Sequence, residues 1–186
     1  MKKLTHDEIS LKRSTLETLN KVNKLPVHVI LNSIRSNYNV GSIFRTSDGA
    51  MIEKLYLSGY TPCPPKKEVL KTALGSTDSV IWEYVKDPKT IITKLKSKGI
   101  KILALELTDK SIPYHEIKPD DFPMGLVVGN EITGVSQEVL DICDKSIEIP
   151  QYGIKQSLNV AVAFGIAIFE LRKLYDINTY GKESKE

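Results

Sequence analysis

The chain has 186 residues, 41% of them hydrophobic and 26% charged, with a formal net charge of +3. This length and composition predict one globular domain with an ordinary core and room for an added arm. No apolar run approaches the roughly 20 residues of a membrane span, and from the polar sequence after the first lysines we expect no secretory signal.

The positive charge is concentrated in the first 24 residues. This segment contains six basic residues and three acidic ones, so it accounts for the whole excess of +3. The basic residues are Lys2, Lys3, Lys12, Arg13, Lys21 and Lys24, and the acidic residues are Asp7, Glu8 and Glu17. A basic arm on a neutral body favours a polyanionic partner. A charged helix that is merely solvated explains the same residues.

Residues 5–23 form the first predicted element, an amphipathic helix. Thr5 and Glu8 make a capping-box pattern, and apolar residues follow at roughly helical spacing as far as Val22. The next predicted elements are a strand over 27–31, a polar loop over 32–41, a helix from Ser42 to about Met51 and a strand over 54–58.

The second half of the chain alternates strands and helices. Strands are predicted over 79–85, 100–107, 126–129 and 146–149, and helices over 88–98 and 137–142. The last helix begins at about Ser157 and is apolar on every face, which predicts that it is buried. The alternation predicts an α/β fold with a mainly parallel sheet flanked by helices. We divide the chain into a basic helical arm (1–24), a main domain (25–176) and a flexible tail (177–186).

The cysteines and histidines give no sign of a metal site. Cys63 and Cys143 lack the spacing of metal ligands, and we interpret them as reduced thiols of a cytoplasmic protein. His6, His28 and His115 also lack ligand spacing, so no metal is expected. No GxGxxG follows the first strand and there is no P-loop motif, which argues against dinucleotide and P-loop sites.

Three polar loops follow predicted strands, where α/β sheets usually carry their sites. In the first loop, 37–41, Gly41 allows a close backbone approach. We expect Arg45, in the first turn of the following helix, to point back toward this loop, where a guanidinium beside a helix N-terminus suits a phosphate. A capped helix with a surface arginine is the alternative. In the second loop, two glycines flank the carboxylate of Glu131.

The third loop brings polar residues to the mouth of the apolar last helix. These residues are Lys155, Gln156, Ser157 and Asn159. Convergent polar groups on a fixed backbone are typical of ligand sites. A core helix with a serine cap is the alternative.

Together the three loops resemble the SpoU/TrmH branch of the SPOUT superfamily, which comprises RNA ribose 2′-O-methyltransferases. The matching patterns are Asn39-x-Gly41-x-x-x-Arg45-Thr46, Gly129-x-Glu131-x-x-Gly134 and Ile149-Pro150-x-x-Gly153-x-x-x-Ser157-Leu158-Asn159-Val160. The resemblance covers about residues 26–175. It departs from the family pattern at Gln151, where methionine is usual, and at Ala161, where serine is common.

The resemblance implies a SPOUT methyltransferase domain with a deep C-terminal trefoil knot, formed by about Gly129 to Ser157. It implies S-adenosylmethionine as the methyl donor, tRNA or rRNA as the substrate, and no membrane. The residues that match donor-binding positions are Gly129, Gly134, Ile149, Gly153 and Leu158. Family members are homodimers with sites at the interface, so Arg45 is expected to reach the partner's cofactor.

The resemblance also implies catalytic roles. Because a guanidinium rarely loses its proton, we interpret Arg45 as an electrostatic clamp on phosphate and nascent alkoxide, and leave a transient base role open. Asn39 would orient Arg45 or the phosphate, while Glu131, Ser157 and Asn159 would order donor and substrate. The predicted RNA contacts are Lys12, Arg13, Lys21, Lys24, Arg35 and Tyr38.

Four further alternatives stay open at this point. Tyr38 could pack on its own domain, and the basic helix could brace the fold through Ile9, Leu16 and Leu19. A non-catalytic RNA-binding or ribosome-assembly factor on the same fold, or a small-molecule enzyme that handles phosphate, could carry similar loops. The sequence does not identify the RNA or the nucleotide.

Overall fold

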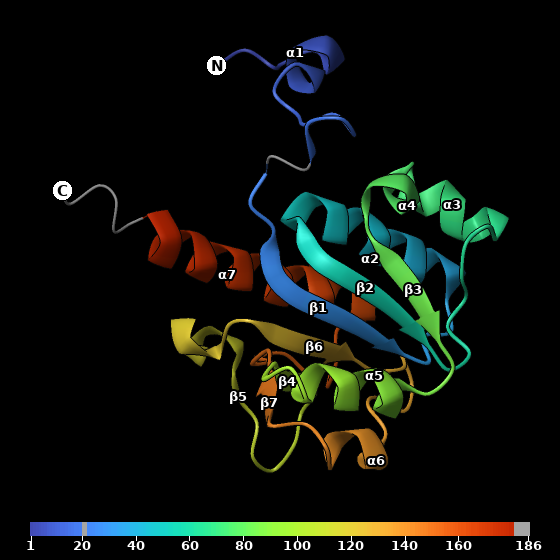
Figure 1. Cartoon of the computed structure of the whole chain (residues 1–186), viewed down its shortest axis with the longest axis vertical. Helices are drawn as coiled ribbons and strands as arrows, with labels where there is room; N and C mark the ends of the chain where they lie inside the picture. The colour runs from blue at the N-terminus through green and yellow to red at the C-terminus, as the bar shows by residue number, and fades with distance from the viewer. Residues whose placement is uncertain (20–21, 181–186) are drawn as a thin grey trace.

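A computed structural model describes residues 1–19 and 22–180 (Figure 1). The strands are β1 (Leu25–Asn32), β2 (Ile52–Ser58), β3 (Trp82–Val85), β4 (Lys101–Leu105), β5 (Ile112–Pro113), β6 (Met124–Val128) and β7 (Lys145–Glu148). The α-helices are α1 (His6–Ser10), α2 (Asn37–Ala50), α3 (Lys67–Ala73), α4 (Ser76–Ser79), α5 (Pro88–Lys96), α6 (Gln137–Leu140) and α7 (Val160–Tyr180). Two short 3₁₀ turns, η2 (Tyr114–Glu116) and η3 (Pro119–Asp121), lie between β5 and β6.

The strands form one sheet in the order β3-β2-β1-β6-β4-β7-β5, and every pair of neighbours is parallel. At the centre, Val29 of β1 pairs with Leu55 of β2 on one side and Leu126 of β6 on the other. The predicted α/β class with a mainly parallel sheet is therefore confirmed. Because the strands are parallel, the loops that follow β1, β6, β4 and β7 leave the same edge of the sheet.

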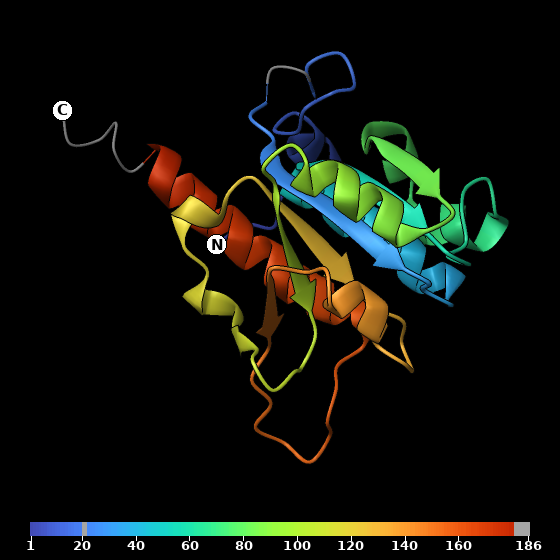
Figure 2. The ribbon, with the colours of Figure 1, turned by 60° about the horizontal axis from the view of Figure 1, so that its bottom comes forward.

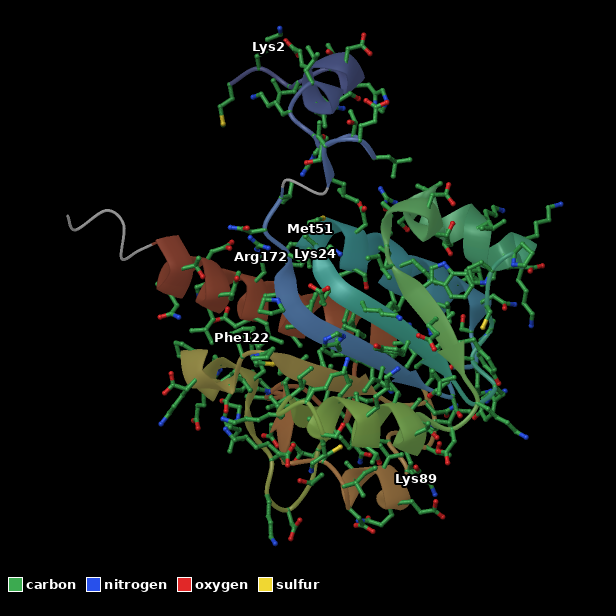
Figure 3. All side chains as sticks on the ribbon, viewed as in Figure 1. Lys2, Lys24, Met51, Lys89, Phe122 and Arg172 are labelled. Carbon is green, nitrogen blue, oxygen red and sulfur yellow. The ribbon has the colours of Figure 1, made fainter. Side chains whose placement is uncertain are left out.

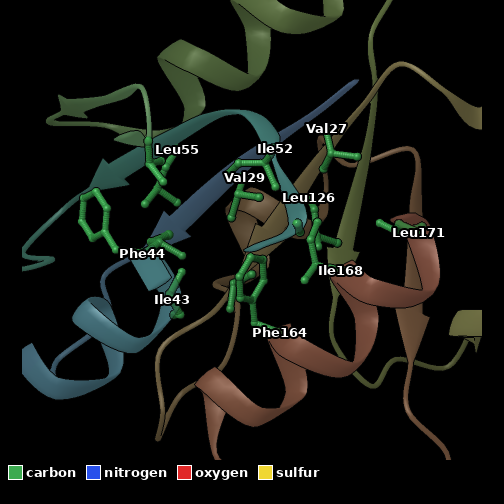
Figure 4. Packing of buried hydrophobic residues seen from close by; sticks show 14 of the residues in the cluster. Val27, Val29, Ile43, Phe44, Ile52, Leu55, Leu126, Phe164, Ile168 and Leu171 are labelled. Carbon is green, nitrogen blue, oxygen red and sulfur yellow. The ribbon is translucent and has the colours of Figure 1, made fainter. Parts of the chain in front are cut away.

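Helices cover both faces of this sheet (Figures 1 and 2). Successive strand residues point to opposite faces, so Val29 packs beneath α2 and α7 whereas Ile30 packs beneath α5. The larger core, drawn in Figure 4, joins Phe44 of α2 and Phe164 of α7 to the central strands. The apolar runs of the central strands are explained by this double coverage.

The predicted continuous arm helix over 5–23 is wrong, because α1 is the only α-helix among the described residues of that segment and residues 11–18 are not helical. The capping box is present: the Thr5 hydroxyl accepts from Glu8 N, and Glu8 Oε2 accepts from Thr5 N at 2.7 Å. Beyond Ser10 the chain forms turns in which Thr15 N donates to Thr18 Oγ1 at 2.8 Å. Such side-chain bonds compete with helix formation, and α1 buries no residue that would extend it by packing. Lys21 lies outside the described residues.

Helix α2 begins earlier than predicted, so residues 37–41 are helical and not a loop. Ser36 is the N-cap, and its hydroxyl accepts from Asn39 N at 3.3 Å. Gly41 serves close packing between helices: a Cβ atom there would lie 1.9 Å from Thr72 Oγ1 and 2.4 Å from the Val69 carbonyl oxygen of α3. The predicted strand over 79–85 is likewise shorter, because Ser79 ends α4.

Helix α7 differs from the prediction at both ends and on its surface. It begins at Val160, with Asn159 capping its first turn, and it extends to Tyr180, so residues 177–180 are not a flexible tail. One side is buried through Phe164, Ile168 and Leu171. The opposite side is exposed: Val162, Ile166 and Phe169 keep 51%, 36% and 50% of their surface, so the predicted burial on every face is wrong.

The arm is tied to the main domain at its base. Arg172 of α7 donates from Nη1 to the carbonyl oxygen of Asn23 at 3.0 Å, beside Lys24 just before β1 (Figure 3).

Within residues 1–19 and 22–180, no helix is long and apolar enough to span a membrane, and no three His, Cys, Asp or Glu side chains cluster as metal ligands. Burial raises the pKa of Cys63, and burial together with Asp144 raises the pKa of Cys143 to about 11. Both thiols are free and stay protonated near neutral pH.

Candidate active site

The loops that follow β4, β6 and β7, together with the start of α7, line a cavity of about 510 Å³ at the carboxyl edge of the sheet. The segment 149–159, which joins β7 to α7, projects from this edge as an open loop (Figure 2). The residues that line the cavity are Leu105, Glu106, Leu107, Val128, Gly129, Asn130, Glu131, Ile132, Gly134, Ile147, Glu148, Ile149, Gln151, Gln156, Ser157, Leu158, Val160 and Ala163. Three of them are carboxylates and none is basic.

The loop after β6 needs both of its glycines. Asn130 and Gly134 close it with two backbone hydrogen bonds of 3.0 and 2.9 Å. A Cβ atom at Gly129 would lie 2.3 Å from the backbone of Gly134 and Val135. Gly134 has a φ of +66°, and a Cβ atom there would lie 2.2 Å from Glu106 Oε2. The turn thus brings the end of β6 and the Glu106 carboxylate together at the cavity wall.

Glu131 holds the start of α2. Its carboxylate accepts from Arg35 N at 2.8 Å, Ser36 N at 3.0 Å and Asn39 Nδ2 at 2.8 Å. Burial raises the pKa of Glu131, but these three donors lower it more, so the net pKa lies below its ordinary value. A carboxylate at a helix N-terminus is also favoured by the helix dipole. Glu131 therefore links the second loop to the first.

Asn39 and Asn159 extend this link to the third loop. Asn159 Nδ2 donates to Asn39 Oδ1 at 3.1 Å, while Asn159 Oδ1 accepts from Ala161 N at 2.9 Å as the cap of α7. The orientation of both amides is fixed, because an ionised Glu131 can only accept and a helix N–H can only donate. The result is one chain of bonds, Glu131–Asn39–Asn159, through all three motif loops.

Asn130 is a buried polar residue that sequence reasoning missed. It is 6% exposed, and its Nδ2 donates to the Ser33 carbonyl oxygen and to the Tyr60 hydroxyl, both at 2.7 Å. Its Oδ1 accepts from Ile132 N and Thr133 N. An asparagine between a glycine and the motif glutamate, directly after an apolar strand, is the signal that could have identified it.

The third loop only partly matches the prediction. Ile149, Ser157 and Leu158 line the cavity, whereas Gly153 does not and lies in the exposed outer part of the loop. The carbonyl oxygen of Ile149 accepts from Gln151 Nε2 at 3.0 Å. The unusual glutamine of this chain therefore occupies a backbone group that the resemblance assigns to the donor.

Arg45 does not reach the cavity of its own chain. Because α2 begins at Asn37, Arg45 lies in its third turn and on a different side from Asn39, so the expectation that it points back to the first loop is wrong. Arg45 is exposed and makes no hydrogen bond or ion pair within the described part of the chain. One chain alone thus leaves the predicted catalytic arginine apart from the predicted donor pocket.

The predicted RNA-contacting residues lie in two places. Lys12 and Arg13 are exposed in the arm, and Lys24 lines a second cavity of about 310 Å³ at the base of the arm. Arg35 and Tyr38 are exposed at the start of α2, beside Glu131.

The residues of the larger cavity fit S-adenosylmethionine. Its volume lies in the range of small-molecule sites, and at Gly129 its wall is bare backbone, because a Cβ atom there would collide with Gly134 and Val135. Glu106, Glu131 and Glu148 suit a ligand that carries positive charge, and Leu105, Val128 and Leu158 offer apolar contact.

The family of the chain follows from its sequence. Residues 26–169 match the model of the SpoU rRNA Methylase family. The chain is 36% identical over 147 residues to the tRNA (guanosine(18)-2′-O)-methyltransferase of Aquifex aeolicus, covering 78% of this chain and 68% of that protein. It is 31% identical over 144 residues to a 23S rRNA (guanosine(2553)-2′-O)-methyltransferase of Bacillus subtilis, covering 77% and 57%. The protein belongs to the SpoU rRNA methylase family.

Solved structures agree with this assignment. The TrmH/SpoU tRNA modifying enzyme of A. aeolicus has a TM-score of 0.78 and 32% identity, with 91% of this chain and 85% of that chain covered. The AdoMet-bound rRNA methyltransferase of Sinorhizobium meliloti has a TM-score of 0.74 and 29% identity, with 81% and 60% covered. The chain spans between 57% and 68% of the length of the curated relatives that it matches.

Proposed function

We propose that this protein is an S-adenosylmethionine-dependent RNA ribose 2′-O-methyltransferase that acts on tRNA or rRNA in the cytoplasm. The observation that carries the proposal is the bond chain Glu131–Asn39–Asn159, which joins the three motif loops beside an acidic cavity. The names of the relatives, guanosine 2′-O-methyltransferases of tRNA and rRNA, support the same reaction.

The charge of the cavity favours this function over a small-molecule enzyme that handles phosphate. Three carboxylates line it without any lysine or arginine, and an anionic phosphate would be repelled there. When bound, S-adenosylmethionine supplies a methyl group on a positively charged sulfur. Gly129, Ile149 and Leu158 would hold it at the cavity wall, and Glu131, through Asn39, would keep the start of α2 aligned with that wall.

The ribose hydroxyl must lose its proton, which would pass to solvent water, as its oxygen attacks the methyl carbon and the bond from that carbon to the donor sulfur breaks. Positioning and stabilisation of the developing oxyanion are therefore the main tasks of the protein. Arg45 performs the second task as a clamp on phosphate and alkoxide, since a guanidinium seldom acts as a base.

The protein works as a homodimer through the exposed apolar side of α7. Val162, Ile166 and Phe169 recur at helical spacing along it, and Leu158, just before the helix, extends the stripe. A Cβ atom at Gly49, one turn beyond Arg45, would lie 3.6 Å from the Phe169 ring, so the α2 surface with Arg45 borders this stripe. A partner seated on the stripe would bring its own donor cavity toward Arg45.

The segment from about Gly129 to Ser157 forms the trefoil knot of the family. An experimental density map traced through these residues would test this.

Transfer of radiolabelled methyl groups to bulk tRNA and rRNA tests the activity, and calorimetry with S-adenosylmethionine tests the donor. We expect donor binding and labelling of ribose 2′-oxygens in one RNA class. Donor binding without labelling of any RNA, or RNA binding without donor binding, would instead favour a non-catalytic RNA-binding factor.

Sedimentation tests the dimer. Phe169→Glu should give a folded, inactive monomer, whereas Leu70→Glu, which changes an exposed leucine of α3, should leave the dimer intact. A fully active wild-type monomer at micromolar concentration would rule out the shared site.

A further inference from the structure

Tyr60 presents an exposed aromatic ring at the edge of the candidate active site. It follows β2 by two residues and so lies at the same sheet edge as the motif loops. Its side chain is 63% exposed, yet its hydroxyl accepts a hydrogen bond of 2.7 Å from the buried amide of Asn130. The ring therefore faces solvent while its polar end is fixed to the loop that carries Glu131.

The backbone on both sides of Tyr60 is held in place. Gly59 has a φ of +63°, and a Cβ atom there would lie 2.1 Å from Ser33 Oγ. The Tyr84 hydroxyl donates to the Gly59 carbonyl oxygen at 2.8 Å. On the other side, the buried hydroxyl of Thr61 donates to the Ser58 carbonyl oxygen at 2.7 Å and accepts from Ile34 N at 3.0 Å. An exposed ring on so constrained a backbone loses little freedom when a ligand binds it.

Two basic residues belong to the segments next to Tyr60. Gly59 N donates to the Lys86 carbonyl oxygen at 3.2 Å, so the backbone of Lys86, just after β3, adjoins the residue before Tyr60. Arg35 lies on the loop after β1 that Glu131 holds, and the Asn130 amide that bonds Tyr60 also donates to Ser33 of this loop. Both side chains are exposed and have no hydrogen-bonding or ionic partner among residues 1–19 and 22–180. Aromatic rings between basic groups are typical of surfaces that bind single-stranded nucleic acid.

We propose that Tyr60 is a stacking platform for an unpaired RNA base next to the methylated ribose, with Arg35 and Lys86 on the adjoining phosphates. This inference rests on the proposed function and adds to it a subsite for single-stranded RNA. The Asn130 bond fixes the position of the ring relative to the Glu131–Asn39–Asn159 chain. A base stacked on the ring therefore determines the orientation in which the RNA enters the site. The competing role for Tyr60 is structural, as a strut that holds Asn130.

Three substitutions at Tyr60 separate the two roles in the full-length protein. Loss of base stacking costs about 10-fold in RNA affinity, so Tyr60→Ala should raise the KM for bulk tRNA or rRNA by that factor. Its donor affinity and kcat should stay at wild-type values. Tyr60→Phe and Tyr60→Trp keep a stacking face without the original hydroxyl bond, and both should retain an RNA affinity within about 2-fold of wild type.

A purely structural role for Tyr60 predicts different results for these variants. If Tyr60→Phe is as impaired as Tyr60→Ala, and both lose donor affinity and thermal stability, the hydroxyl bond to Asn130 is the important feature and the platform is wrong. An unchanged KM in Tyr60→Ala also overturns the proposal. His115→Ala, which removes an exposed ring from the distant η2 turn, is the matched control and should leave RNA affinity unchanged.

Equilibrium RNA binding distinguishes this inference from the proposed function. If the wild-type protein binds RNA but transfers no methyl group, the methyltransferase proposal fails, while the Tyr60 series still reports the platform through dissociation constants. If the wild-type protein methylates RNA and the Tyr60 series shows no difference in RNA affinity, only the platform fails. A wild-type protein that binds neither bulk tRNA nor bulk rRNA overturns both.

Discussion

At the scale of single residues, the site depends on the direction of two side-chain amides. Asn39 must donate to Glu131 and accept from Asn159, and neither a carboxylate nor an aliphatic side chain can do both. The arrangement of the three motif segments beside the cavity therefore depends on hydrogen bonds between protein side chains.

Asn39→Asp should make the site sensitive to pH. Two carboxylates would then face one another, so the start of α2 would be repelled from Glu131 at neutral and alkaline pH. We expect methyl transfer to fall about 100-fold there and to recover partly at acid pH, where the pair holds a proton and one carboxyl can donate again. Asn39→Ala should lose activity equally at every pH. A pH profile of Asn39→Asp parallel to that of the wild type would contradict this role.

Gln151→Met should strengthen donor binding. The change frees the Ile149 carbonyl oxygen, which now accepts from Gln151 Nε2, for the ligand that the family resemblance assigns to it. We expect the dissociation constant for S-adenosylmethionine, measured by calorimetry, to fall several-fold. Gln137→Met, far away on α6, is the control. If both variants match the wild type, the Ile149 carbonyl plays no part in donor binding.

Sequence reasoning identified most of these residues but not their partners. Asn39, Glu131 and Asn159 were recognisable from motif spacing, yet the bonds that join them cross 92 and 120 residues of chain. No local pattern predicts that Glu131 caps the backbone of Arg35 and Ser36. Tyr60 escaped notice for the same reason, because its ring becomes informative only when β1, β2 and β6 lie side by side.

At the scale of elements, the central strands were predicted well and the helix ends poorly, and α3, α4 and β5 were not predicted. β-Branched and apolar runs identify a doubly covered strand directly, as in β1 and β6. The ends of α1, α2 and α7 depend instead on caps and packing that pattern alone does not reveal. Ser36 and Asn159 became recognisable as caps only when their bonds to the following N–H groups were visible.

Asp121 connects the amino ends of three strands through ion pairs, so it should stabilise the fold at neutral pH and lose this contribution in acid. It is 3% exposed, and its Oδ1 accepts from Lys101 of β4 at 3.0 Å and Lys145 of β7 at 2.8 Å, just before β6. Burial alone would raise its pKa, but the two lysines and the Lys118 N–H lower it from 3.8 to about 2. The contribution to folding is thus complete above about pH 4 and disappears as pH falls toward 2.

Urea unfolding at several pH values checks this prediction. The free energy of unfolding should fall over that window by about 1 to 2 kcal/mol more in the wild type than in Asp121→Asn, allowing for the exposed lysines. Asp78→Asn, on the separate helix α4, is the control and should follow the wild type. Identical pH dependence in Asp121→Asn and the wild type would show that the ion pairs contribute nothing.

At the scale of the whole molecule, the arginine and the donor cavity of one chain do not meet, which makes complementation between chains a direct test. Arg45→Ala should lower methyl transfer about 100-fold without changing donor affinity. Ser157→Trp should place an indole at the cavity mouth and abolish donor binding. Coexpressed, the two should regain about a quarter of wild-type activity, because half of the dimers would carry one intact site. Arg45 acting within its own chain would give no recovery.

The basic arm is the second feature at this scale. If Lys12 and Arg13 contact phosphates, replacing both with glutamine should reduce the slope of log K against log salt by about 1.5. The methylated nucleotide should stay the same, since phosphate contacts carry no sequence choice. Lys94 and Lys98, exposed at the other end of the molecule near α5, provide the matched control pair. A lower melting temperature with an unchanged slope would show that the arm braces the fold through Leu16 and Leu19.

The order of the strands also determines when this protein can fold. β1 is made early, but its inner neighbour β6 follows roughly a hundred residues later, and α7 covers the larger core last of all. During synthesis, β1 and β2 therefore stay without their partner β6, and their apolar side chains stay exposed, until most of the chain has left the ribosome. Contacts this distant in sequence make folding slow and leave the nascent chain prone to aggregation. We expect productive folding to start only after α7 has left the ribosome.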